Sequence, residues 1–334
     1  MDSKNVLEVK NLKKYYPIKA GVLKHTVGHV KSVDNVSFSI GRAKTFGLVG
    51  ESGCGKTTVG RTLLRLTEPT EGEAFLEGKD IFKMSERELK SIRPKMQMIF
   101  QDPFASLNPR MPIGEAIKEP VREHKLVPKD ELMEYTLDIM KHCGIPSFFA
   151  ARYPHEFSGG QRQRICIARA LAMKPQLIIA DEPVSALDMS IQAQIINLMK
   201  DLQEEYGLSY LFISHDLSVV EYLADEVGVM YLGSIVERAK KEDLFANPMH
   251  PYTRALLSAV PVPDPNRKMK RIVLGGDIPS PSNPPKACKF HTRCPHAMPV
   301  CGEVTPKYID YGDGHCVACH LYPQENDKNV IDDR

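Results

Sequence analysis

One eight-residue stretch constrains the fold of this chain more than any other. The letters "GESGCGKT" at 50–57 follow a short apolar run, "TFGLV", and precede a stretch with apolar residues at helical spacing. A strand, a glycine-rich turn and a helix in this order match the pattern Gly-x4-Gly-Lys-Thr of a phosphate-binding loop. The glycines let backbone N–H groups converge on phosphate, and the helix N-terminus adds positive potential. Lys56 would then reach the terminal phosphates and the Thr57 hydroxyl would ligate magnesium, whereas the alternative is an ordinary glycine turn.

The strands and helices expected around this loop predict an α/β fold. Residues 33–40 alternate apolar and polar positions, and further strands are expected at "QLIIADEP" and "LSYLFISHD". The helical stretch "SIQAQIINLMKDLQEEY" separates these last two strands. Such alternation is typical of a doubly wound parallel sheet. A mostly helix-like region after Gln101 indicates an inserted helical subdomain at about 101–160.

Two carboxylates and a histidine follow the later strands. Asp181 and Glu182 end one strand, and His215 ends the next. An acidic pair at this place is more often a solvated turn, and such a histidine is usually structural. With a phosphate loop upstream, however, Asp181 can hold the magnesium shell, and Glu182 can orient or deprotonate an attacking water.

A second glycine-rich helix start occurs in the stretch "FSGGQRQR" at 157–164. Its helix N-terminus can be aimed at an anion, as the first one can. Because the first loop is sufficient for one ATP, the second is expected to serve the ATP of a facing subunit. The sequence therefore predicts a head-to-tail dimer.

The ordered motifs "GESGCGKT", "FSGGQ", "LIIADEP", "SALD" and "ISHD" resemble those of the ATPase subunits of ATP-binding cassette (ABC) transporters, over roughly residues 5–260. The resemblance implies a P-loop NTPase (RecA-like) core with antiparallel β and helical subdomains, and the cofactors ATP and Mg²⁺. It implies Glu182 and His215 as catalytic residues. The ATP-binding residues it implies are Tyr16, Gly50, Glu51, Ser52, Gly53, Cys54, Gly55, Lys56, Thr57, Thr58, Gln101 and Asp181. Thr57, Gln101 and Asp181 are the implied magnesium ligands. Residues implied to bind the partner's ATP are Ser158, Gly159, Gly160, Gln161 and Asp188.

Further stretches narrow this resemblance to one group of importers. "QDPFASLNPRMPIGE", "HPYTRALLSAVPVPDP" and the terminal cysteine pattern are similar to those of the ATPases of dipeptide and oligopeptide importers, and the similarity extends to residue 322. It implies two transmembrane permease subunits, a paired ATPase subunit and, indirectly, an extracytoplasmic peptide-binding protein as partners. It also implies a peripheral location on the cytoplasmic face of the cell membrane. Importers of nickel or sugars, and a soluble cassette ATPase acting on ribosomes or DNA, are the alternatives.

Composition agrees with these expectations. The 44 basic and 42 acidic residues give a net charge of +2, which provides no strong field for binding nucleic acid. The first ten residues carry charges and lack the apolar core of a secretory signal. No apolar run approaches the roughly 18 residues of a spanning helix, so any membrane association is expected to be peripheral.

The composition changes near Pro261, where a proline-rich stretch begins. This change predicts an ABC ATPase domain at 1–260 and a small Cys-rich, metal-binding domain at 261–334. Roughly seventy residues bury too little apolar surface to fold unaided, so the second domain is expected to need a stabilising crosslink or metal.

Five of the eight cysteines lie between residues 288 and 319. In a reducing cytosol such thiols are available as metal ligands. In this importer group the spacing of Cys288, Cys294, Cys301 and Cys319 resembles that of a [4Fe–4S] ligand set, to which four thiolates are sufficient. Cys316 precedes Cys319 at a spacing that zinc sites favour and is an alternative fourth ligand. Tetrahedral zinc, unligated thiols and a redox-sensing role remain open alternatives.

Overall fold

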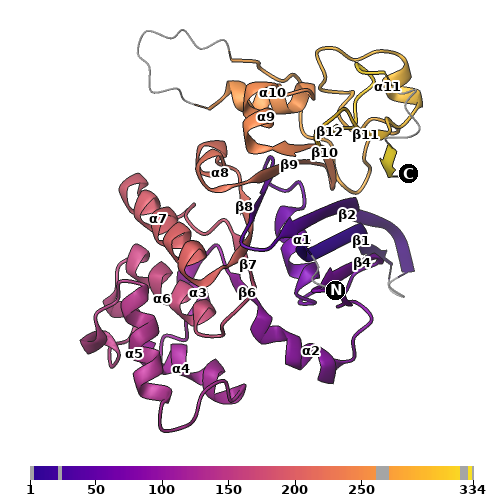
Figure 1. The fold of residues 1–334 in the computed structure, drawn as a ribbon. Coiled ribbons are helices and arrows are strands. Elements are labelled where there is room, and N and C mark those ends of the chain that lie inside the picture. Colours follow the sequence, from indigo (N-terminus) through magenta and orange to yellow (C-terminus); the bar gives the residue numbers. More distant parts are fainter. Residues whose placement is uncertain (1–3, 22–24, 261–270, 324–329, 333–334) are drawn as a thin grey trace, which may run out of the picture. The chain divides into compact units, whose positions relative to one another are not determined.

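The computed structural model describes residues 4–21, 25–260, 271–323 and 330–332 (Figure 1). The chain divides into two compact units, of which the first comprises Met1–Leu7, Ile40–Thr45 and Leu76–Ser214. The second comprises Glu8–Ser39, Phe46–Phe75 and His215–Arg334. The predicted boundary near Pro261 lies outside the described residues.

Parallel strands form the centre of the first unit. They are β6 (Met96–Ile99), β7 (Leu177–Asp181) and β8 (Ser209–Ser214). β7 pairs in parallel with both neighbours. Every residue of β7 and β8 is buried, which explains the continuous apolar runs in the sequence, because a parallel strand is covered on both faces. Helix α7 (Met189–Tyr206) connects β7 to β8, as expected.

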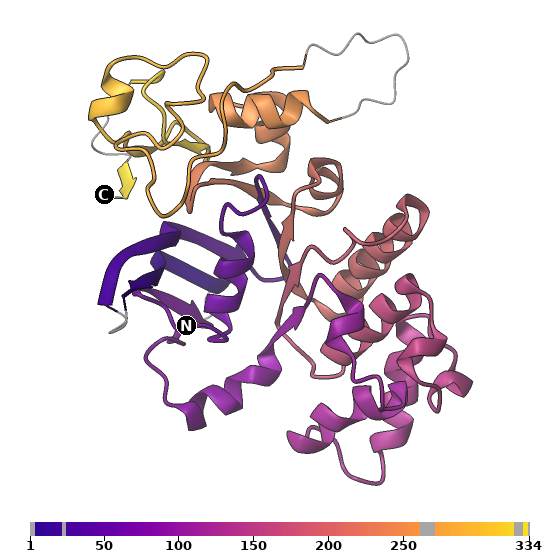
Figure 2. The same ribbon diagram turned by 180° about the vertical axis from the view of Figure 1, so that it is seen from behind.

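Helices make up most of the remaining first unit. Helices α4, α5 and α6 contact one another and form one group in the views from the front and from behind (Figures 1 and 2). Apolar side chains at helical spacing are buried in this group, among them Ile113, Ile117 and Val121 of α4. The helices of this part are α2 (Glu86–Ile92), α3 (Pro103–Ser106), α4 (Ile113–Glu123), α5 (Leu132–His142) and α6 (Gly159–Leu171).

The second unit contains most of a sheet in which β1 (Asn5–Ala20) lies between β2 (His25–Gly41) and β4 (Glu71–Leu76). The short β5 (Lys79–Asp80) follows β4 at the edge of that sheet. Val33 of β2 is buried, and from Val36 to Ile40 buried residues alternate with partly exposed ones. This alternation is the pattern from which the strand was predicted.

A second group of strands in this unit positions the phosphate loop. β3 (Thr45–Val49) pairs in parallel with β9 (Glu226–Tyr231), which forms an antiparallel hairpin with β10 (Ser234–Lys240). The hairpin turns at Gly233, whose φ of +83° suits glycine. Helix α1 (Lys56–Leu63) follows β3. The other helices are α8 (Leu217–Leu223), α9 (Lys241–Ala246), α10 (Pro251–Ser258) and α11 (Val300–Glu303).

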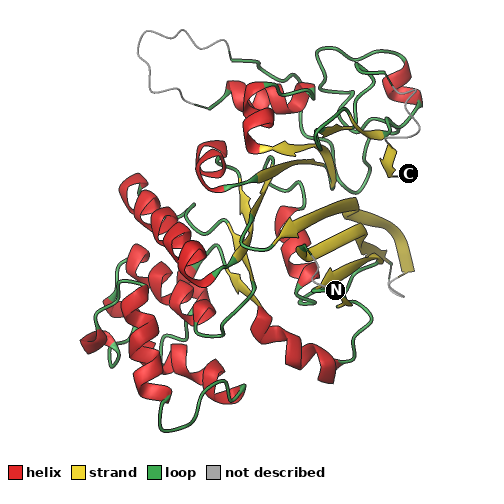
Figure 3. Ribbon diagram, viewed as in Figure 1, coloured by secondary structure: helices red, strands yellow, loops and turns green. Residues whose placement is uncertain are grey.

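The C-terminal segment extends this group of strands. β12 (Cys316–Val317) pairs antiparallel with β10, β11 (Tyr308–Asp310) pairs with β12, and β13 (Val330–Asp332) pairs with β11. Most of the segment is otherwise loop (Figure 3). Phe290 is buried, and its ring centroid lies 5.2 Å from that of Tyr231 and 5.4 Å from that of Tyr252. The segment therefore shares the core of the hairpin instead of building one of its own.

Among the helices that the structure describes, none combines the length and apolar character that crossing a membrane requires.

Candidate nucleotide site

The glycines of the phosphate loop are required by close backbone approaches. Gly50 has a φ of +154°, and a Cβ there would lie 2.2 Å from the Met230 carbonyl oxygen. Gly55 has a φ of +110°, and a Cβ there would lie 2.0 Å from the Ser32 carbonyl oxygen. Any other residue would force the loop away from the strand and hairpin that hold it.

The side chain of Lys56 reaches across the loop and binds the loop backbone. This side chain is buried, and Nζ donates to the carbonyl oxygens of Gly50 at 2.8 Å and Glu51 at 3.1 Å. Helix α1 begins at this lysine and carries no acidic residue in its first turn, so its N-terminus keeps its positive potential. The remaining residues predicted for this part of the site lie in the loop or in the first turn of α1: Ser52, Gly53, Cys54, Thr57 and Thr58.

Two further predicted residues belong to the same unit. Tyr16 lies on β1 with an exposed ring, and the Lys14 Nζ is 4.8 Å from the ring centroid. His215 is exposed and precedes Asp216, whose carboxylate accepts a hydrogen bond from the Ser218 N–H at the start of α8. Both side chains are therefore in contact with solvent.

The carboxylates lie in the first unit, at the end of β7. Asp181 is 3% exposed, and Glu182 follows it in the left-handed backbone region, with a φ of +47°. Such a conformation is unusual for glutamate and occurs where the surrounding structure imposes it. Here the Glu182 N–H donates to the Ile213 carbonyl oxygen at 2.9 Å. The structure brings Gln101 and Glu182 together, with a hydrogen bond of 3.0 Å from Gln101 Nε2 to Glu182 Oε2.

The second glycine-rich segment forms the start of α6 in the first unit. Ser158 is its N-cap: Oγ accepts from the Gln161 N–H, while Gln161 Oε1 accepts from the Ser158 N–H at 3.0 Å. This reciprocal capping box fixes the geometry of the helix start. Gly160 lies close to α7, because a Cβ there would be 2.4 Å from Ile191 Cγ2. Asp188, at the N-cap position of α7, is exposed.

Two residues that contact the phosphate loop were not predicted from the sequence. The Tyr252 hydroxyl accepts a hydrogen bond from the Glu51 N–H at 2.9 Å, and the Arg293 guanidinium binds the Glu51 carboxylate. Both lie about two hundred residues or more along the chain from the loop. No local pattern in the sequence indicates such contacts.

Of the cysteines predicted as cluster ligands, Cys301 and Cys319 are buried and Cys288 and Cys294 are partly exposed. Burial raises the pKa of the Cys319 thiol to about 11, and the negative charges of Cys288, Cys294 and Cys301 add to this effect. Burial likewise raises the pKa of Cys288 to about 11, with further contributions from Cys301 and Cys294. Four thiolates have the donor chemistry of a [4Fe–4S] cluster. In the described part of the chain, however, no three Cys, His, Asp or Glu side chains are arranged closely enough to hold a metal ion. The expected metal-binding domain is therefore not borne out by the geometry.

Cys316 has different surroundings. Its Sγ accepts from Arg238 Nη2 at 3.6 Å and donates to the Gly314 carbonyl oxygen at 3.3 Å. Burial raises the pKa of this thiol to about 11 as well, but Arg238 opposes the shift, and the charges of Asp310 and Glu226 add to it. After burial, the main influences on this thiol are the charges of Arg238, Asp310 and Glu226.

Comparison with known proteins agrees with the motifs. Residues 33–185 match the family model of the ABC transporter, and residues 236–301 match that of the oligopeptide/dipeptide transporter C-terminal region. The oligopeptide transport ATP-binding protein AppF of Bacillus subtilis (strain 168) is 56% identical over 324 residues, covering 96% of this chain and 98% of its own length. The chain belongs to the ATP-binding subunits of the oligopeptide importers in the ABC transporter family.

Other members and solved structures support the assignment. The putative oligopeptide transport ATP-binding protein YkfD of Bacillus subtilis (strain 168) is 51% identical, covering 98% of each chain. A dimeric structure of the ATP-binding cassette MJ0796 bound to ADP and Pi is 29% identical, with a TM-score of 0.62. It covers 70% of this chain and 98% of its own. This ABC subunit thus shares the ATPase fold, and its family hydrolyses ATP.

Proposed function

We propose that this ABC subunit hydrolyses ATP to power the import of dipeptides or oligopeptides through a membrane permease, on the cytoplasmic face of the membrane. The observation that carries the proposal is the phosphate loop, with its two closely packed glycines and its buried Lys56. The peptide cargo is inferred from relatives named as oligopeptide transport proteins that match nearly the whole chain.

Each part of the predicted site has a separate task in this proposal. The phosphate loop and the N-terminus of α1 bind the phosphates, and Tyr16 stacks on the adenine. Thr57, Gln101 and Asp181 supply the oxygen donors that suit Mg²⁺, which would neutralise phosphate charge. Glu182 orients the attacking water and accepts its proton, and the 3.0 Å hydrogen bond from Gln101 holds the Glu182 carboxylate. His215 contacts the γ-phosphate.

The start of α6 completes the site of a paired ATPase subunit. The capping box uses the N–H groups of Ser158 and Gln161 to fix the helix start, and the first turn carries no acidic residue, so the helix N-terminus keeps a positive potential that attracts phosphate. We therefore propose that Ser158, Gly159, Gly160 and Gln161, together with Asp188, bind the nucleotide held by the partner. The partners of this dimer are two permease subunits, with a peptide-binding protein outside the membrane.

Two substitutions test the ATPase assignment. Glu182→Gln removes the proton acceptor but keeps the side-chain volume, so ATP binding should persist while hydrolysis falls by at least a hundredfold, within the usual range for a general base of about 10²–10⁴. Lys56→Ala should instead weaken ATP binding itself. Binding is measured by titration calorimetry, and turnover by phosphate release. Near-normal turnover in Glu182→Gln would reject its role as the base.

We also propose that Cys288, Cys294, Cys301 and Cys319 ligate a [4Fe–4S] cluster, with zinc as the alternative metal. The spacing of these cysteines, which resembles the ligand set of this importer group, supports the proposal, and the Cys288 N–H donates to the Cys301 carbonyl oxygen at 3.1 Å. The contacts of Cys316 with Arg238 and Gly314 favour leaving Cys316 out of it.

A further inference from the structure

The phosphate loop contains a carboxylate that ought to oppose its function. Glu51 directly follows Gly50 in this loop, and an ionised side chain beside a phosphate site repels the nucleotide. The side chain is 25% exposed, so solvent screens its charge only in part. A loop of this kind needs a nearby cation to compensate the charge or to turn the carboxylate away from the nucleotide.

Arg293 of the C-terminal segment supplies that cation. Its Nη1 donates to Glu51 Oε2 at 2.7 Å, and its Nη2 donates to Glu51 Oε1 at 3.1 Å. Two parallel hydrogen bonds between guanidinium and carboxylate fix orientation as well as charge. The Arg293 side chain is only 8% exposed, and it lies against the Tyr231 ring, 5.9 Å from the centroid. This environment shields the pair from solvent.

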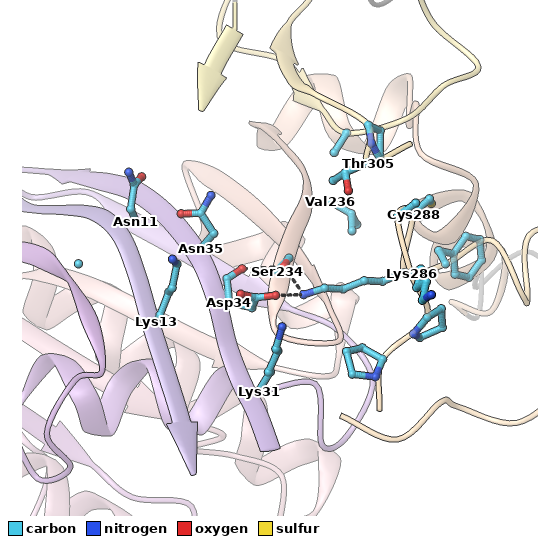
Figure 4. Close-up of a pocket in the computed structure, with 18 of the residues that line it drawn as sticks. Asn11, Lys13, Lys31, Asp34, Asn35, Ser234, Val236, Lys286, Cys288 and Thr305 are labelled. Atoms are coloured by element: carbon cyan, nitrogen blue, oxygen red, sulfur yellow. Dashed lines mark hydrogen bonds and ion pairs between the residues drawn. The ribbon is translucent and has the colours of Figure 1, made fainter. Parts of the chain in front are cut away.

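The segment that carries Arg293 is anchored beside the loop. Lys289 donates to Asp34 Oδ2 at 2.7 Å, to the Leu232 carbonyl oxygen at 3.0 Å and to Ser234 Oγ at 2.8 Å. Asp34 and Ser234 lie close together in the wall of a cavity of about 830 Å³ (Figure 4). Lys289 thus joins the C-terminal segment to β2 and to the hairpin of β9 and β10.

The hairpin of β9 and β10 and the nearby Tyr252 also contact the backbone of the phosphate loop. The Gly233 N–H donates to the Cys54 carbonyl oxygen at 2.9 Å. Tyr252, whose hydroxyl accepts from the Glu51 N–H, packs against Phe290 of the C-terminal segment. Glu51 is therefore fixed through its backbone by Tyr252, which packs against the C-terminal segment, and through its carboxylate by Arg293 of that segment.

We propose that Arg293 is a positioning residue for nucleotide binding: its ion pair neutralises Glu51 and turns the carboxylate away, so that the phosphate loop accepts ATP. The C-terminal segment is thereby part of the nucleotide-binding apparatus. This inference rests on the proposed nucleotide site.

Charge-removing variants of the full chain test the proposal. Arg293→Gln should raise the Kd for Mg·ATP by about tenfold, because it leaves a half-buried carboxylate unpaired beside the phosphates. Lys286→Gln is the matched control: it removes one positive charge from an exposed position of the same segment, and its Kd should stay within twofold of the wild type. Turnover at saturating ATP should change much less than Kd in Arg293→Gln, because the catalytic carboxylate is untouched.

A double variant separates charge compensation from a structural role. Glu51→Gln combined with Arg293→Gln removes both charges, so it should recover most of the lost affinity, with the single Glu51→Gln variant completing the cycle. Arg293→Lys should recover part of it. If Arg293→Gln fails to fold by circular dichroism, Arg293→Lys and the double variant are compared in its place.

Three results would overturn the proposal: a Kd for Arg293→Gln within twofold of the wild type, a double variant as weak as the single one, or an equal loss in the Lys286→Gln control. Lys56→Ala distinguishes this failure from failure of the nucleotide site. If Lys56→Ala binds ATP normally, the site itself is wrong. If it loses binding while Arg293→Gln does not, only the role of Arg293 is rejected.

Discussion

Replacing Glu237 by alanine should destabilise the second unit strongly. Glu237 lies on β10 opposite Val317 of β12, and its side chain is fully buried. Its carboxylate accepts the backbone N–H of Met249 at 2.7 Å and that of His250 at 2.8 Å. The ring nitrogen Nε2 of His315 lies 2.8 Å from Glu237 Oε1. One carboxylate therefore connects the hairpin, the start of α10 and the C-terminal segment.

The magnitude follows from the groups that the substitution leaves unpaired. Each buried donor without a partner costs about 1–3 kcal/mol. The two backbone N–H groups lose their acceptor, whereas the His315 side chain is 13% exposed and can recover hydrogen bonds with water. We expect a total of about 3–5 kcal/mol, the range found when one partner of a buried ion pair is removed. This loss corresponds to a fall in Tm of roughly 6–20 °C.

Thermal unfolding followed by circular dichroism measures this loss, because the chain contains no tryptophan for fluorescence. Glu303→Ala is the matched control: Glu303 is exposed in α11 of the same unit, and its loss should change stability by about 0.5 kcal/mol or less. A fall in Tm of under about 2 °C for Glu237→Ala would refute the reasoning, because it would mean that the carboxylate network contributes almost nothing.

Two further predictions concern a histidine and the cysteines. Burial lowers the pKa of His250 to about 4, so the folded state does not take up the proton that the unfolded chain binds below its ordinary pKa of about 6.5. The free energy of unfolding should therefore fall by roughly 3 kcal/mol as the pH drops from about 6.5 to 4. In His250→Asn, urea unfolding over this pH range should show a smaller dependence of that free energy on pH. An unchanged dependence would contradict the assignment. Anaerobically purified protein should be brown and contain about four iron and four sulfide per chain, and Cys294→Ser should lose them. Colourless protein with stoichiometric zinc, or with no metal, would reject the cluster.

Several elements were predictable because they depend on short stretches of sequence. The strand, loop and helix around Lys56 occur as expected, since the glycines, the apolar run and the helical spacing are local signals. β7, α7 and β8 follow for the same reason. The C-terminal segment was expected to need a stabilising metal because the sequence suggests that it has only its own small core. Phe290, packed against both Tyr231 and Tyr252, gives it a share of another core.

The nucleotide chemistry of this ABC subunit was determined by the sequence alone, because phosphate binding needs glycines, a lysine and a hydroxyl at fixed positions along one turn. The partners of Glu51 and Glu237, and the separate surroundings of Cys316, were decided only by the tertiary structure. Arg293 and Glu51 are 242 residues apart, and their contact exists only when β3, the hairpin of β9 and β10 and the C-terminal segment have packed together. Local patterns carry no information about such a contact.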